Sequence, residues 1–463
     1  MKKEELLKLE KEEIIEVLFA VIEQLTARIS ELETRLNQNS NNSSKPPSSD
    51  GLNKPPAKSL RQKTGRKPGG QVGHKGHGLK LEREPDEVVT VNPIECDKCG
   101  FNLSMEPMQH ADTRYVYDIV IEVKLVQYII QKAICPQCKS ITVGSPPPEC
   151  KGTQNYGNAI RALCVVMTNY ANVSIDKTRK ILRDLLDIPI SGGTIKTIQR
   201  ECAAKTSDAI KEIKKHLLAS PTLGVDETGC RIAGKTQWIH VASNSKYTLL
   251  SVHGKRGREG IESGGIVSEY EGTLIHDCWS PYFGFDKCKH ALCVAHLMRE
   301  LIALIESGQV WATDMLELLL EMKNVVDRYK DNDKTELSNY YRNKFAQRYD
   351  EILSSAKQEI VPSTTRKKSK AENLLIRLEK YQIEIIRFTE DFDVPFDNNQ
   401  AERDIRNVKV KQKVSGCHRT EDDARDYANT ASVIGTVIKL GKSVVGAVRG
   451  LFDGQNPVAG ATE

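Results

Sequence analysis

Two acidic residues stand in strand-like segments of this sequence, where acids are uncommon. Asp226 lies in the middle of Thr222–Ala233, TLGVDETGCRIA, in which apolar residues alternate with smaller or polar ones. Asp277 ends a second short apolar run, Gly272–Cys278, GTLIHDC. Aspartate has poor β propensity and is costly to bury, so a single strand aspartate usually caps a turn or pairs with a basic side chain. A second instance favours a functional pair.

Further runs separate these two segments and place them in an informative order. Thr236–Ser243 and Tyr247–His253 are strand-like, and a helix-like piece covers Ile261–Tyr270. The order strand, strand, strand, helix, strand, with acids on the first and last strands, is that of a ribonuclease-H-like fold. In that fold the first and fourth strands are neighbours, which would bring both carboxylates to one metal site. The pattern therefore indicates a nuclease or a transposase.

A third acid follows after a long helical interval. After Asp277, the run KHALCVAHLMRELIALIE predicts a strand leading into a helix. An all-helical insertion then covers about residues 300–395, with helices expected at Leu316–Tyr329, Leu337–Ala356 and Leu374–Glu390. The motif DNNQAER comes next and places Glu402 about one turn into a helix. The basic residues that follow on this helix are Arg403, Arg406, Lys409, Lys411 and Lys413.

Glu402 is favoured as the last metal ligand over several neighbouring acids. Asp404 is two positions further along the helix and so points about 200° away. Asp397 precedes two asparagines and suits a helix N-cap, where its oxygen would accept backbone N–H groups. The acids at 390–393 precede Pro395 and are expected in a connecting loop, where positioning is looser than on a helix.

Four cysteines form two C-x-x-C pairs separated by 35 residues. Four thiolates with this spacing suit one tetrahedral structural zinc ion, whereas four unrelated buried cysteines are the alternative. Apolar strands between the pairs, such as Tyr115–Gln131, would complete a ribbon-like module at 95–150. The proposed zinc ligands are Cys96, Cys99, Cys135 and Cys138.

Charge is concentrated near the N-terminus. The chain of 463 residues carries a net charge of +5, but residues 45–80 alone hold nine Lys or Arg and one acid. This stretch is rich in Pro, Gly, Ser and Asn and has no apolar period, so 45–94 is expected to be a disordered linker. In a DNA-binding protein its basic residues would release counterions from phosphates; a solvated spacer is the alternative. The expected DNA contacts there are Arg61, Lys63, Arg66 and Lys67.

Helical patterns flank the linker. Residues 1–44 carry a 4-3 repeat of Ile and Leu, which favours a parallel coiled coil between chains over an amphipathic helix that packs on its own domain. Residues 155–218 are helical, with Ser174 as an N-cap, and a helix from Thr194 to Lys215 follows the turn Ser191-Gly192-Gly193. This resembles a helix-turn-helix, with Lys196 and Arg200 as DNA contacts, and a plain helical bundle is the alternative.

The chain shows no apolar signal region at its N-terminus and no run of membrane-spanning length. Twelve cysteines without secretion signals favour a reducing cytoplasm, with metal ligands and buried thiols rather than disulfides.

The order of these parts, with the motifs GVDET, HDCWSPY, CVAHLMREL and DNNQAERDIRNVKVKQKVSG, resembles the insertion-sequence 66 family of DDE transposases. The similarity covers nearly the whole chain, and it also includes NSSKPPSSD and GGQVGHKGH. It implies a catalytic domain at 220–412 that contains the helical insertion, and a C-terminal helical segment at 413–463. It also implies Asp226, Asp277 and Glu402 as the catalytic acids and the four paired cysteines as zinc ligands. Cys293 and His296 match a C-x-x-H motif of many such transposases and suit a buried structural pair. Cys278 and Trp279 depart from the usual Asp-Gly-Tyr form after the second acid.

The expected reaction is phosphodiester transesterification at the ends of a transposable element. Negative charge grows at phosphorus, and two Mg²⁺ or Mn²⁺ ions about 3.5–4 Å apart would stabilise it. Asp226 would bridge the ions, while Asp277 and Glu402 would each hold one. The basic helix after Glu402 would contact DNA through Arg403, Arg406, Lys409 and Lys411.

The expected partners are double-stranded DNA, at the element's ends and at the target, and further copies of the chain through the coiled coil. Small accessory proteins from the same element are possible partners by resemblance, and no membrane is expected. The expected location is the nucleoid of a prokaryotic cytoplasm. Two alternatives stay open: a nuclease of the same fold that does not transfer strands, and a DNA-binding regulator with an inactive catalytic domain.

Overall fold

The structure is a computed structural model that describes scattered residues between 11 and 43, then 83–147, 150, 152, 154–362 and 368–460. The chain forms two compact units. The second unit covers Ala57–Gln127, and the first covers Met1–Pro56 and Tyr128–Glu463.

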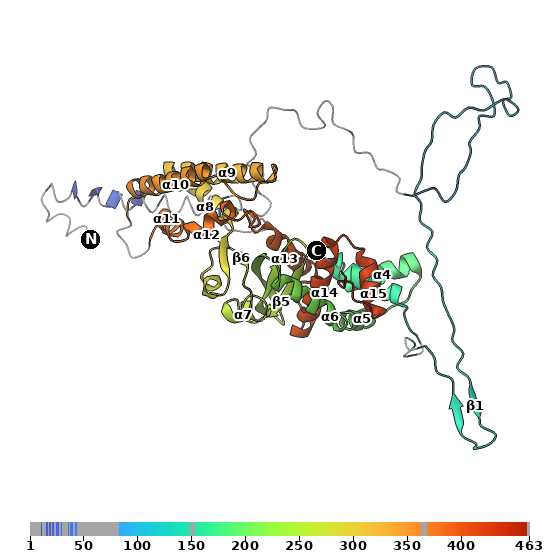
Figure 1. Cartoon of the computed structure of the whole chain (residues 1–463). Coiled ribbons are helices and arrows are strands. Elements are labelled where there is room, and N and C mark those ends of the chain that lie inside the picture. Colours follow the sequence, from blue (N-terminus) through green and yellow to red (C-terminus); the bar gives the residue numbers. More distant parts are fainter. Residues whose placement is uncertain are drawn as a thin grey trace. The chain divides into compact units, whose positions relative to one another are not determined.

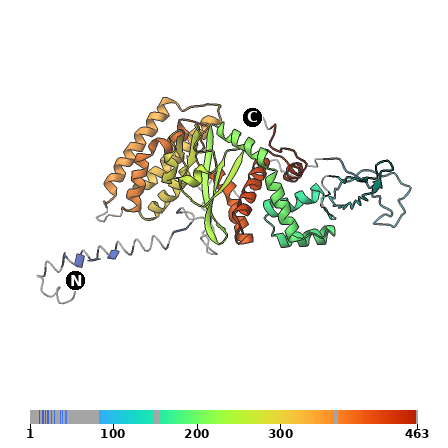
Figure 2. The same cartoon turned by 90° about the horizontal axis from the view of Figure 1, so that it is seen from below.

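A five-stranded mixed sheet organises the first unit (Figures 1 and 2). Its strands lie in the order β5-β4-β3-β6-β7, in which β3, β4 and β5 are antiparallel, and β6 and β7 run parallel to β3. The prediction that the first and fourth strands are neighbours is confirmed, and the fold is mixed α+β. The bounds are β3 Thr222–Ile232, β4 Lys235–Ser243, β5 Thr248–His253, β6 Thr273–His276 and β7 Lys289–Leu292.

The side chains of β3 alternate between two cores. Leu223 and Val225 pack in a cluster shared with the helices that precede the sheet, whereas Cys230 and Ile232 pack against α13 (Asn399–Ser415). Because the strand period is two, Asp226 has the parity of Cys230 and faces the α13 side. The edge strand β5 is covered by α14 (Glu421–Lys439), whose Ser and Thr hydroxyls accept two of the N–H groups of β5.

One expected helix is shorter than the sequence suggested. The segment between β5 and β6 forms α7 only over Arg258–Glu262, not over Ile261–Tyr270. A glycine pair follows, and Gly265 has a φ of 67°, which a continuing helix cannot accommodate. The apolar residues after it, Ile266 and Val267, have irregular backbone, but their side chains are still buried.

The interval before the third acid is helical in every element that the structure describes there. It contains α8 Val294–Glu306, α9 Val310–Lys330, α10 Asn339–Glu359, α11 Lys370–Lys380 and α12 Gln382–Ile386. The predicted strand into helix at β7–α8 is confirmed. The prediction of one helix over Leu374–Glu390 is wrong, because Tyr381 leaves the helical conformation and stacks its ring on Phe283 at 4.3 Å.

Helices α3 to α6 precede the sheet. They are α3 Asn158–Val165, which continues as a π-helix over Val166–Tyr170, α4 Ile175–Leu186, α5 Gly192–Ala204 and α6 Ser207–Leu218. Ser174 caps α4, as predicted, by accepting the N–H of Lys177 at 3.3 Å. The single helix predicted over Thr194–Lys215 is wrong. Ser191 caps the start of α5, which ends at Ala204. The helix is interrupted near Thr206, whose hydroxyl donates to the carbonyl of Ala203. A last helix, α15, covers Val444–Phe452.

The expected strand at Tyr115–Gln131 does not form. These residues have no strand assignment, and apolar side chains such as Val120 and Leu125 are almost fully exposed. A strand needs a hydrogen-bonded neighbour. Over residues 83–147, strand pairing consists of β1 (Lys132–Ile134) with β2 (Ile141–Val143) and, separately, one isolated bridge between Glu95 and Asn102.

The N-terminal region is described only at scattered positions. All described residues from 11 to 36 are helical, and the apolar repeat residues among them are exposed: Ile15, Leu18, Ile22, Leu25, Ile29 and Leu36. In the described part of the chain, no helix is long and apolar enough to cross a membrane.

Candidate active site and DNA interface

The sheet places the first two acids at matching positions. In the parallel pair, Gly224 of β3 lies opposite Ile275 of β6. Asp226, within β3, and Asp277, one residue after the end of β6, are each two residues beyond this pair. Asp277 leaves the strand, and its Oδ1 accepts the N–H of Trp279 at 3.0 Å.

Helix α13 brings Glu402 to the same edge. Asn398, just before this helix, donates from Nδ2 to the carbonyl of Val225 at 2.7 Å and from its backbone N–H to Cys293 Sγ at 3.1 Å. The close approach needs Gly224, because a Cβ there would lie 2.5 Å from Asn398 Oδ1. Glu402 then lies in the first turn of α13, one residue after buried Ala401.

The charges of Glu402 and Asp277 both act on Asp226. The pKa of Asp226 rises to about 8 because of burial, the adjacent charge of Glu227 and the charges of Glu402 and Asp277. Burial also raises the pKa of Asp277. The oxygens of these acids do not form a group within 4.8 Å of one another among the described residues.

A fourth acid, Glu227, belongs to this edge and was missed from the sequence. Its side chain is only 3% exposed, accepts two bonds from the Arg256 guanidinium at 2.9 and 2.7 Å, and accepts the Tyr282 hydroxyl at 2.5 Å. Burial raises the pKa of Glu227, although the hydrogen bonds from Tyr282 and Arg256 act to lower it. Arg256 in turn lies over the rings of Trp238 and Trp279, at 5.0 and 4.1 Å. The signal was present as a second acid directly after Asp226, but its arginine partner is remote in sequence.

The competing acids have other partners. Asp397 Oδ1 accepts the N–H of Asn399 at 3.0 Å, as a capping residue would, although the N-cap position itself is Asn398. Asp404 forms a buried ion pair with Lys439 at 2.6 Å. Asp391 accepts the N–H of Asp393 in the loop before α13.

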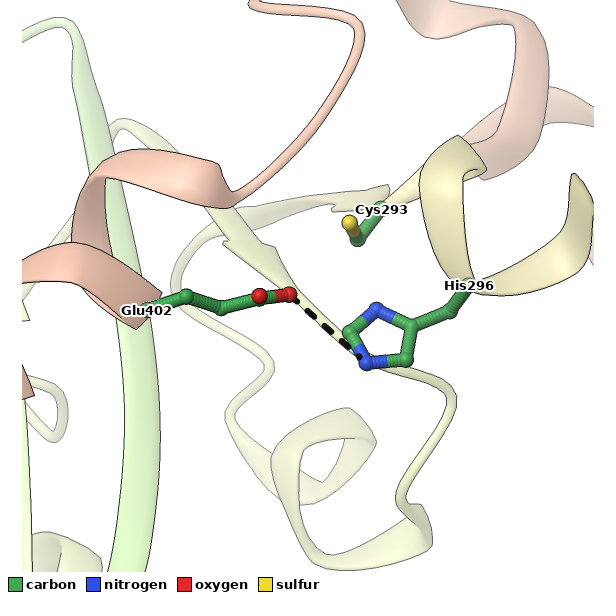
Figure 3. A group of neighbouring side chains, drawn as sticks. All are labelled: Cys293, His296 and Glu402. Atoms are coloured by element: carbon green, nitrogen blue, oxygen red, sulfur yellow. Dashed lines mark ion pairs between the residues drawn. The ribbon is translucent and has the colours of Figure 1, made fainter. Parts of the chain in front are cut away.

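Cys293 and His296 lie near the carboxylate of Glu402 (Figure 3). His296 Nε2 lies 3.7 Å from Glu402 Oε1, and a guanidinium nitrogen of Arg299 lies 3.5 Å from the same oxygen. Burial raises the pKa of the Cys293 thiol to about 12 and lowers the pKa of His296 to about 4. His276 is fully buried beside His290, with a pKa lowered by burial to about 3, so it suits a core residue rather than a general base.

The predicted DNA contacts of the described region fall into two groups. Lys196, Arg200 and Lys411 line one pocket of about 840 Å³ between α4, α5, the end of α13 and the start of α14. Lys196 and Arg200 lie 3.1 and 3.7 Å from buried Asp423. Lys411 donates to the carbonyl of Thr168 at 2.7 Å, and burial lowers its pKa to about 8.

The remaining predicted contacts on α13 do not line this pocket. Arg403 bonds Gln400 on its own helix, and Lys409 bonds the carbonyl of Gly229. Arg406 is exposed. Sequence reasoning missed Arg419, which lines the pocket, is exposed and makes no hydrogen bond or ion pair to any residue that the structure describes.

Each cysteine pair forms the same local turn. The backbone carbonyl of Cys96 accepts the N–H of Gly100, and the N–H of Cys96 donates to the carbonyl of Phe101. In the same way, the carbonyl of Cys135 accepts the N–H of Lys139, and the N–H of Cys135 donates to the carbonyl of Ser140. Gly100 and Lys139 both have positive φ, 72° and 59°. Hydrogen bonds lower the pKa of Cys138 to about 7, with Ser140 contributing most, and those from Lys98 and Cys99 lower the pKa of Cys96. Arg61, Lys63, Arg66 and Lys67 lie outside the described residues.

The site thus belongs to a mixed α+β protein that gathers carboxylates at one edge of its sheet. The family model "Transposase IS66 family" matches residues 154–426. This is more than half of the chain, so the chain belongs to the IS66 family of transposases. A second model, "Family of unknown function (DUF6444)", matches residues 1–80. A comparison with curated proteins found no match.

Proposed function

We propose that this protein is a DNA transposase that cleaves the ends of its element and joins them to target DNA in a metal-dependent reaction. The observation that carries the proposal is the convergence of Asp226, Asp277 and Glu402 from β3, the end of β6 and α13. The strand order and the matching positions of the two aspartates support a ribonuclease-H-like domain with the helical insertion between its second and third acids.

The residues at this edge fit divalent ions of the magnesium class. The acids offer only oxygen ligands, which Mg²⁺ and Mn²⁺ prefer, and the neighbouring acids help to raise the pKa of Asp226. Asp226 would serve both ions, and Asp277 and Glu402 would each serve one. When bound, such ions stabilise the charge that develops on the phosphate and on the attacking and leaving oxygens.

The protein's own groups orient these ligands. Asn398 fixes the start of α13 to β3, so Glu402 is held on a rigid helix beside Asp226. Arg256 neutralises Glu227 and lies over Trp279, directly after the segment that carries Asp277. This pairing uses the charge of Glu227 and leaves Asp226 and Asp277 without an ion pair among the described residues, whereas Glu402 faces Arg299.

The remaining parts would supply DNA binding and assembly. The basic pocket and the linker would bind DNA phosphates, and helices α4 and α5 would act as a helix-turn-helix. Cys96, Cys99, Cys135 and Cys138 would hold one structural zinc ion, which the matching turns support. The N-terminal repeat would associate chains as a dimer or higher oligomer, since its described apolar residues are exposed. We place the protein at the DNA of a prokaryotic nucleoid, with accessory proteins of the element as further partners.

The test compares Glu402→Gln with Asp397→Asn on a labelled duplex that carries the element's end. Glu402→Gln removes a charge and keeps the shape, so we expect loss of Mg²⁺-dependent cleavage with unchanged DNA binding, while Asp397→Asn keeps cutting. The opposite result would assign the third ligand to Asp397. Cleavage without joined products would favour a plain nuclease, and the absence of cleavage by the wild type would favour a regulator.

A further inference from the structure

Glu402 belongs to a second cluster besides the acids of the sheet edge. Cys293, His296 and Glu402 each offer one ligand atom, and these atoms all lie within 4.8 Å of one another. They form the only such group of three among the described residues. Figure 3 shows that Glu402 extends from its helix toward the other two side chains, which come from the start of α8 and the residue before it.

Two polar atoms of this cluster lack hydrogen-bond partners. Glu402 Oε1 and His296 Nδ1 are buried and make no hydrogen bond. The 3.7 Å separation of Glu402 Oε1 from His296 Nε2 is too long for a hydrogen bond. A buried polar atom without a hydrogen-bond partner destabilises the fold, and a bound ion is one of the few arrangements that would satisfy it.

The chemistry of the donors differs from that of the sheet edge. One sulfur, one imidazole nitrogen and one carboxylate oxygen suit zinc-class ions, whereas Mg²⁺ prefers oxygen alone. The Asn398 N–H that donates to Cys293 Sγ is the kind of outer contact that orients a metal-bound thiolate. Arg299, 3.5 Å from Glu402 Oε1, is the competing cation, and its side chain is 22% exposed, so it can turn outward.

We propose that Cys293, His296 and Glu402 bind one zinc-class ion, with a water in the fourth position, and that this ion inhibits the transposase by occupying Glu402. On binding, the Cys293 thiol releases its proton to solvent. The inhibition, but not the binding, rests on the function proposed above, because it requires Glu402 to serve the magnesium-class ions.

The binding is tested by counting zinc in the full-length protein. Wild type, Cys293→Ala, His296→Gln and Cys164→Ala are equilibrated in the same zinc-buffered solution, and zinc per chain is measured by mass spectrometry. We expect one zinc ion fewer in Cys293→Ala and in His296→Gln than in wild type. Cys164→Ala, the same change at a fully buried thiol of α3, should match wild type. Equal zinc in all four folded proteins would overturn the proposal.

The inhibition is tested in the Mg²⁺-dependent cleavage assay with added micromolar zinc. We expect zinc to slow the wild type and Cys164→Ala at least tenfold, and to leave Cys293→Ala within twofold of its own rate without zinc. Equal inhibition of both cysteine variants would overturn the inhibitory role. If no protein cleaves DNA, the proposed function fails, while the zinc count still decides the site. If Cys293→Ala does not fold, as judged by circular dichroism, His296→Gln takes its place.

Discussion

Asp226→Asn should make the metal-free protein more stable, although it should abolish catalysis. The folded protein raises the pKa of Asp226 from 3.8 to about 8. Between these values the folded chain holds a proton that the unfolded chain releases, so stability falls as pH rises through this window. Asparagine removes the charge, and its Oδ1 can still accept the N–H of Glu227, which now lies 2.8 Å from Asp226 Oδ1.

The size of the effect follows from the pKa. Each pH unit between the two pKa values lowers the free energy of unfolding by about 1.4 kcal/mol. The charge of Asp226 therefore destabilises the fold at pH 7 by at most about 4 kcal/mol. Asp226 keeps some contact with solvent, and we therefore expect a gain of about 2 kcal/mol, or a rise in Tm of about 2–3 °C for a unit of this size. The measurement is thermal unfolding of the full chain in EDTA from pH 5 to pH 8, where the wild-type Tm should fall more steeply than that of the variant.

Asp314→Asn is the matched control, because it makes the same change on an exposed residue of α9 and should not alter the pH dependence. Adding Mg²⁺ should stabilise wild type and leave Asp226→Asn nearly unchanged. If Asp226→Asn is no more stable than wild type at pH 8, burial and the neighbouring acids do not raise the pKa of Asp226, and the reasoning about this site is wrong.

The remaining predictions concern the parts around the site. Gly224→Ala should place a methyl group 2.5 Å from Asn398 Oδ1, cost about 1–3 kcal/mol of stability and slow cleavage; an unchanged urea midpoint would contradict the close packing of α13. Arg419→Ala should weaken DNA binding several-fold and lower the salt dependence by about one counterion without changing Tm; equal affinity in a salt titration would remove the pocket from the DNA interface. Cys138→Ser should lose one zinc ion per chain and weaken DNA binding, whereas wild type with less than about half an equivalent would contradict the zinc module. Deletion of residues 1–44 should lower the number of chains per particle measured by light scattering. An unchanged number of chains would instead support a helix that packs on its own domain.

Local patterns determined much of the catalytic region in advance. Strand alternation and the order of segments were enough to predict that β3 and β6 are neighbours, because sequential β and α patterns leave few topologies. Helical periodicity put Glu402 one turn into its helix and turned Asp404 away, and capping chemistry placed Ser174. These features depend on residues close together in the chain, so sequence reasoning reaches them. Tyr115–Gln131 shows the limit, since its apolar composition favours a strand but only a partner can complete one.

Only the tertiary structure decided which charged groups are free. Lys409 and Lys411 were predicted to contact DNA. In the structure their ammonium groups donate hydrogen bonds to backbone carbonyls of β3 and of the π-helix. Glu227 is buried and paired with the exposed Arg256, because strand parity and a later loop bring them together. The angle at which α13 meets β3 depends on a glycine in one segment and an asparagine in another. That packing also brings Glu402 close to the Cys293–His296 pair, which no local pattern predicts.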